Sequence, residues 1–215
     1  WAGNVSALTS EQAASRERTL LLALLLSMWA PLATGIAVLL SHSTTQLADF
    51  IRRTVELVAL FVSWWAFRSL QRNLSLTVDD RERRETLASR SVAAAMICSG
   101  VVMLTVAASR VADFRPGGNV IVGVVIAILG LITNGWFWRR YAAMTREHFS
   151  PIIGAQRQLY RAKTFVDCCV LTALMAVAIA PAHPATRAID LLGSVAVAAY
   201  LMWSGVRTIR LRADG

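Results

Sequence analysis

The chain has 215 residues, of which 56% are hydrophobic and 16% are charged, and its mean hydropathy is +0.53. This composition is too apolar and too poor in charge for a soluble domain, so an integral membrane protein is predicted. The net charge of +9 would suit a nucleic-acid-binding protein, but the basic residues lie almost wholly between apolar runs. Basic residues in such places orient a chain in the membrane, so we expect contact with the lipid bilayer and none with nucleic acid.

Six apolar runs are each long enough to cross a bilayer, which takes about 20 residues. The first run follows a polar tail, residues 1–18, and is too long for the core of a cleaved signal peptide. The last run precedes a short tail, residues 210–215, so residues 19–209 are expected to form one all-α transmembrane domain. The predicted spans are residues 19–40, 46–70, 86–111, 120–138, 159–179 and 188–206. The charged stretch 68–85 and the polar stretch 139–158 are predicted to be loops outside the membrane.

The basic residues also predict how the chain is oriented. Most of the 22 lie in the N-terminal tail, in the second and fourth connections, or after the last span, whereas the other three connections hold only Arg110, Arg115 and Arg187. Connections rich in arginine and lysine stay on the cytoplasmic side. The pattern predicts an even number of spans with both termini in the cytoplasm.

The second run is unusual because it contains Asp49, Arg52, Arg53 and Glu56. Their spacing of i, i+3, i+4 and i+7 places all four side chains on one stripe of a helix. Charged side chains within a membrane turn away from lipid, pair with one another and commonly mark a functional site. We therefore expect these residues to face other helices. Asp49 is interpreted as a helix-end carboxylate paired with Arg53.

No sequence motif suggests an enzyme. The chain has no nucleophile elbow, glycine-rich phosphate loop or zinc-protease motif. Its histidines, His42, His148 and His183, fall in three different connections and form no ligand cluster. We expect neither catalysis nor a bound cofactor.

Three segments resemble the transmembrane domain of the cation diffusion facilitator family: LADFIRRTVEL (47–57), ITNGWFWRR (132–140) and YRAKTFVDCCVLTAL (160–174). The resemblance covers about residues 19–209. It implies a six-helix bundle in a bacterial inner (plasma) membrane, proton-coupled antiport of a divalent metal, and a homodimer. It also implies a transport site with two acidic residues four apart on the second helix, and a His or Asp with an Asp four apart on the fifth.

The sequence departs from that family pattern at the transport site. The implied positions hold Arg52 and Glu56 on the second helix, and Lys163 and Asp167 on the fifth. Arginine and lysine are cations without a free lone pair, whereas a zinc site needs anionic or neutral donors. The four charges sum to zero, so we predict that this site does not bind a metal as the family does.

Three interpretations of these charges remain open. In one, Arg52–Asp167 and Lys163–Glu56 are structural ion pairs between the second and fifth helices. In another, the protein transports a cargo that carries negative charge, such as an organic acid, a zwitterion or a metal chelate, because arginine recognises carboxylate and phosphate well. Proton coupling would then run through Glu56 or Asp167. In the third, the chain is a non-transporting subunit of a membrane partner protein.

Asn134 is expected to form a hydrogen bond between helices.

Overall fold

The computed structural model describes residues 10–41, 44–73, 76–112, 120–179 and 184–213. All regular secondary structure in this part of the chain is helical, which confirms the all-α class. The helices are α1 (Ser10–Ser41), α2 (Thr44–Arg72), α3 (Val78–Ala112), α4 (Val120–Glu147), α5 (Pro151–Ile179) and α6 (Pro184–Ala213).

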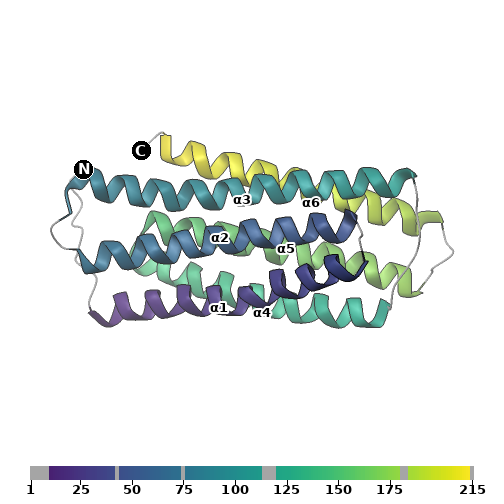
Figure 1. Ribbon diagram of the computed structural model, residues 1–215, viewed down its shortest axis with the longest axis horizontal. Coiled ribbons are helices and arrows are strands. Elements are labelled where there is room, and N and C mark those ends of the chain that lie inside the picture. The colour runs from purple at the N-terminus through teal and green to yellow at the C-terminus, as the bar shows by residue number, and fades with distance from the viewer. Residues whose placement is uncertain (1–9, 42–43, 74–75, 113–119, 180–183, 214–215) are drawn as a thin grey trace.

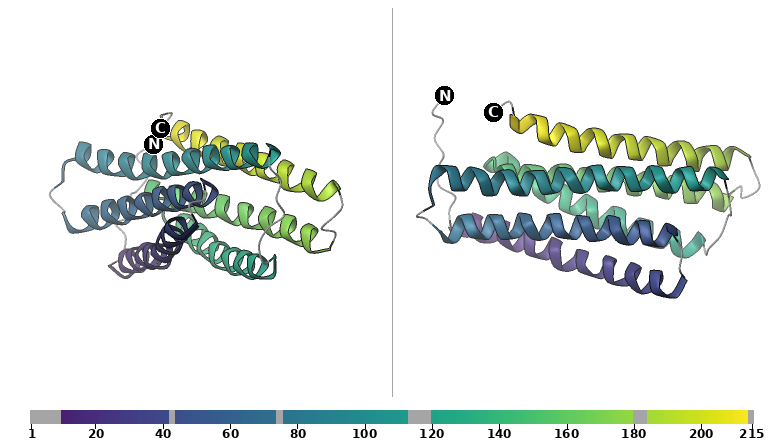
Figure 2. Two further views of the ribbon diagram at one scale, coloured as in Figure 1. Left: turned by 45° about the vertical axis from the view of Figure 1, so that its right-hand side comes forward. Right: turned by 45° about the horizontal axis from the view of Figure 1, so that its top comes forward.

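In the view of Figure 1 the helices lie in three tiers: α3 with α6, α2 with α5, and α1 with α4. The most extensive contacts join α3 to α6 and α4 to α5, and α2 packs against both α1 and α3 (Figure 2). Successive helices run in opposite directions, so α1 begins and α6 ends at the same end of the bundle. We call this end the basic end, because it carries Arg16, Arg68, Arg84, Arg140 and Arg207. The tier of α2 and α5 lies in the middle, where it contacts helices of both other tiers.

The helices extend beyond the predicted spans at the basic end. α1 begins at Ser10 rather than at residue 19, and α4 continues past residue 138 to Glu147. The predicted loops 68–85 and 139–158 are therefore mostly helical, because hydropathy detects only the apolar width of a bilayer and not the polar turns beyond it. At the start of α3, the Asp80 N–H donates to Thr77 Oγ1 (3.2 Å), and the Thr77 hydroxyl donates to Asp80 Oδ2 (2.8 Å). This reciprocal capping starts the helix outside the apolar run.

Large apolar side chains are exposed on every one of these helices, as lipid contact requires. The exposed fraction reaches 73% at Trp29, 64% at Ile132 and 70% at Leu192. Within the described residues, two helical segments are long and apolar enough to cross a membrane by length and composition alone, Val78–Ser109 and Leu191–Arg210.

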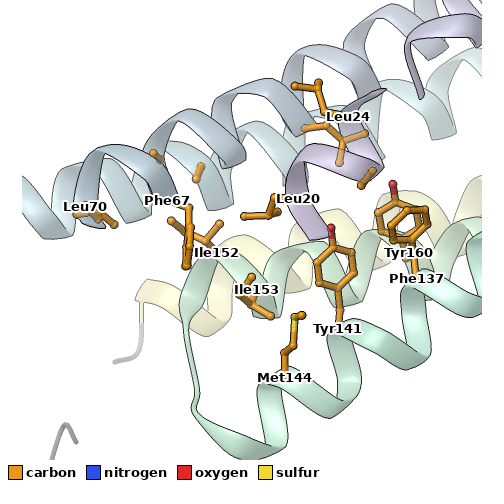
Figure 3. Close-up of a cluster of buried hydrophobic side chains, with 14 residues drawn as sticks. Leu20, Leu24, Phe67, Leu70, Phe137, Tyr141, Met144, Ile152, Ile153 and Tyr160 are labelled. Carbon is orange, nitrogen blue, oxygen red and sulfur yellow. The ribbon is translucent and has the colours of Figure 1, made fainter. Parts of the chain in front are cut away.

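A cluster of buried apolar side chains lies in the half of the bundle next to the basic end. Its centre is aromatic: the ring of Tyr160 lies 4.9 Å from that of Phe137 and 5.4 Å from that of Tyr141. Leu20 and Leu24 of α1 close over these rings (Figure 3). A second cluster joins α2, α3, α5 and α6 around Met96, Leu159 and Leu201.

Glycine lets α3 and α6 approach closely. A Cβ at Gly100 would lie 2.9 Å from the Ala198 carbonyl oxygen, and a Cβ at Gly205 would lie 2.9 Å from the Ala93 carbonyl oxygen. Backbone atoms cannot move aside as a flexible side chain can. These two positions therefore set the distance between the helices.

Candidate functional site

The middle tier brings Glu56 of α2 and Lys163 of α5 into direct contact. Lys163 Nζ lies 2.8 Å from Glu56 Oε2, and each side chain is 15% exposed. Both residues lie near the middle of their helices, which is the depth of the bilayer centre in a spanning bundle. The ion pair expected between these two residues is thus present.

A third helix completes the surroundings of Glu56. The Ser99 hydroxyl of α3 donates to Glu56 Oε1 at 3.1 Å, so each carboxylate oxygen has a partner of its own. Lys163 also lies over the ring of Tyr160, with Nζ 5.2 Å from the ring centroid. This cation–π contact adds a second stabilising interaction for the ammonium group.

Asp167 lies one helical turn beyond Lys163 and faces α4. Asn134 Nδ2 donates to Asp167 Oδ2 at 2.7 Å, which is the interhelical hydrogen bond expected of Asn134. Gly130 makes room for this carboxylate, because a Cβ there would lie 3.2 Å from Asp167 Oδ2. A neutral amide thus donates a hydrogen bond directly to Asp167.

Arg52 supplies the fourth charge of the predicted quartet. It lies within electrostatic range of Glu56, Lys163 and Asp167. The side chain of Asp49 lies outside the described residues, so its predicted pairing with Arg53 stays a prediction. The structure gathers Arg52, Glu56, Lys163 and Asp167 around the contact between α2 and α5.

Sequence reasoning missed Ser99 and Gly130. Ser99 lies in an apolar run that contains several small residues, and nothing in the sequence distinguishes it as a partner of Glu56. Gly130 is one of two glycines in the apolar segment GVVIAILG (123–130), and nothing in the sequence distinguishes it as the one that faces Asp167. Their roles depend on which helices meet, and a single sequence does not specify this.

The site contains two cationic side chains, Arg52 and Lys163, and two carboxylates, Glu56 and Asp167. Among the described residues there is no group of three or more His, Cys, Asp and Glu side chains placed to hold a metal ion. The ammonium group of Lys163 instead stands where a bound cation would neutralise Glu56.

A comparison with models of known protein families identifies the family of this chain. The model of the cation efflux transmembrane domain matches residues 20–213, which includes nearly all of the six helices. The chain belongs to the cation efflux family. The resemblance to cation diffusion facilitators is thereby confirmed, and with it an integral membrane protein of a cation-transporter family. A search of curated proteins found no match.

The cation efflux assignment gives the Lys163–Glu56 contact its significance. The sequence resemblance implies metal ligands on these two helices, and the ammonium group of Lys163 occupies one of the implied positions. The amine is covalently tethered to α5, so it cannot leave the site as a transported ion does.

Proposed function

We propose that this cation efflux protein is a secondary transporter whose central site has been recoded for a cargo that carries negative charge. Such a cargo is an organic anion, a zwitterion or a metal chelate, and its movement is coupled to protons. We further propose that the protein acts as a homodimer in a bacterial inner membrane with both termini in the cytoplasm. It is not an enzyme. The observation that carries the proposal is the 2.8 Å contact between Lys163 Nζ and Glu56 Oε2.

Electrostatics argues against a bare divalent metal as the cargo. A metal ion approaching Glu56 would have to displace the ammonium of Lys163 and would meet the charge of Arg52 nearby. In a site of low dielectric, such like-charge contacts are costly. An anionic group is attracted by the same two cations and can replace the carboxylate of Glu56 as the partner of Lys163.

That exchange of partners supplies a mechanism for proton coupling. When a cargo anion pairs with Lys163, Glu56 loses its closest counter-charge while it stays mostly buried. A buried carboxylate that loses a contacting cation takes up a proton more readily, because burial disfavours its charged form. One proton then enters the site with each cargo anion that pairs with Lys163, and both leave together when Lys163 returns to Glu56.

Reconstitution into liposomes tests this mechanism. The panel of cargoes consists of carboxylates, amino acids, phosphates and zinc citrate. We expect at least one of them to acidify the liposome interior, as reported by a trapped pH-sensitive dye, and we expect Glu56→Gln to abolish that signal. The matched control is Glu17→Gln, which removes a carboxylate whose distance to Arg68 is 3.6 Å and which is 33% exposed at the basic end. Uptake of bare zinc ions in preference to every anionic cargo would refute the proposal.

One observation favours a second function, that of a non-transporting subunit. Both oxygens of Glu56 are already satisfied within the protein, by Lys163 and Ser99, so the ion pair needs no ligand. In this case the pair holds α2 and α5 in one arrangement. The protein would then co-purify with a membrane partner, and no member of the cargo panel would move in liposomes.

A further inference from the structure

A groove runs along the exposed side of α4, where α4 meets α5. Its volume is about 610 Å³, which is within the range of small-molecule sites. Its apolar wall includes Ile132 and Trp136, which are 64% and 52% exposed, and Thr164 of α5. These exposed fractions place the groove on the outer surface of the bundle, and its residues lie next in sequence to Asn134 and Lys163.

The groove is hollow because Gly135 has no side chain. A Cβ at this position would meet only Thr164 Cγ2, at 3.9 Å, which is an ordinary contact. A larger side chain at Gly135 would therefore point into the groove without a clash at its first atom.

Two arginines close one end of the groove. Arg139 and Arg140 line it and are both exposed. Arg140 Nη2 donates to Ser15 Oγ at 2.9 Å, and a hydroxyl is a neutral acceptor that leaves the guanidinium charge in place. From Ile132 to Arg139 the helix rises about 10 Å. The groove thus leads from the apolar surface of α4 to a pair of cations at the basic end.

We propose that this groove binds an anionic phospholipid, with the phosphate on Arg139 and Arg140 and an acyl chain along Ile132 and Trp136. A lipid provides an anion and an apolar chain joined at the spacing that the groove presents. Basic pockets between membrane helices bind anionic headgroups in this manner. A free anion would match the two arginines alone, whereas a lipid also matches the exposed apolar wall at Ile132 and Trp136.

Lipid titration followed by native mass spectrometry of the purified protein tests the proposal. The probes are phosphatidylglycerol and phosphatidylcholine with the same acyl chains. We expect the wild type to prefer phosphatidylglycerol, and Arg139→Gln/Arg140→Gln to weaken that binding about fivefold or more while binding of phosphatidylcholine changes little. The control is Arg207→Gln/Arg210→Gln, which removes the same charge from exposed positions of α6 at the same end.

A second variant tests the apolar part of the site. Gly135→Leu fills the groove and keeps both arginines, so we expect it to reduce retention of phosphatidylglycerol by a similar factor. Circular dichroism checks that each variant remains helical. Equal losses in the two arginine double variants would show a general surface-charge effect and overturn the proposal, as would full retention of phosphatidylglycerol in Gly135→Leu.

Discussion

The Glu56 carboxylate is held from two directions, by Lys163 of α5 at 2.8 Å and by Ser99 of α3 at 3.1 Å. The sequence allowed the first contact to be predicted, because a charge within an apolar run requires a partner of opposite sign. The contact with Ser99 could not be predicted, because a serine in an apolar run can equally be a small residue that lets two helices pack closely. Charged residues in membrane spans are thus informative from sequence, whereas their neutral partners are found only once the helix neighbours are known.

Removal of the ammonium group should destabilise the bundle. Lys163→Met leaves the mostly buried Glu56 without its counter-charge, and we expect a loss of about 3 kcal/mol in the free energy of unfolding. Lys163→Met/Glu56→Gln should recover most of that loss, because no unpaired charge is left. Thermal unfolding in detergent measures both effects. The control is Arg68→Met, which breaks the exposed pair with Glu17 and should cost at most about 1 kcal/mol.

Replacement of Arg52 and Lys163 should increase the affinity of the site for zinc. Arg52→Gln/Lys163→His removes both positive charges and adds an imidazole donor beside Glu56 and Asp167, so we expect it to bind zinc more tightly than the wild type does. Isothermal titration calorimetry measures the affinity. Arg52→Gln/Lys163→Gln removes the same charges without adding the imidazole and should bind zinc more weakly. Equal zinc binding by wild type and both variants would contradict the electrostatic argument.

At the scale of helices, the six helices were predictable from the apolar runs but their ends were not. α1 begins well before its apolar run because Arg16, which is 2% exposed, is fixed to the end of α4. Arg16 Nη2 donates to the carbonyl oxygens of Met144 and His148, both at 2.8 Å. Burial lowers the pKa of Arg16, although a guanidinium stays charged at any physiological pH. A contact between residues 16 and 148 cannot be read from local composition, and it extends both helices past the apolar stretch.

The close approach of α3 and α6 leads to a prediction about glycine. Gly100→Ala and Gly205→Ala each place a Cβ 2.9 Å from a carbonyl oxygen of the facing helix, so we expect each to destabilise the fold by about 1–3 kcal/mol. Gly193→Ala, also on α6, is the control because a Cβ there meets nothing within 4 Å. Thermal unfolding in detergent compares the three variants. A loss at Gly193 equal to that at Gly100 would show that helix contact is not the cause.

At the scale of the whole molecule, the basic end is the part of the bundle that we predict to face the cytoplasm. α1 begins there and α6 ends there, and the arginine-rich connections that the sequence predicts to be cytoplasmic lie at that same end. Apart from the expected contact between the second and fifth helices, the packing of helix against helix was not predicted from the sequence, because apolar side chains cover every helix and do not specify their neighbours.

Cysteine labelling tests the orientation. The native thiols Cys98, Cys168 and Cys169 are free and are first replaced by alanine. Asp80→Cys and Glu147→Cys then place single thiols at the basic end. We expect a membrane-impermeant maleimide to label neither in intact cells and both after permeabilisation. Labelling in intact cells would mean that the basic end faces outward.

The aromatic cluster at the basic end and the proline of α1 have a mechanical consequence. The interdigitated side chains of Leu20, Phe137, Tyr141 and Tyr160 hold the helices together at the basic end. Pro31 lies farther along α1, where it removes one backbone hydrogen bond of the helix. A helix bends most readily at such a residue, so a motion that admits a solute to the Lys163–Glu56 pair would move the part of α1 beyond Pro31 while the aromatic cluster stays packed.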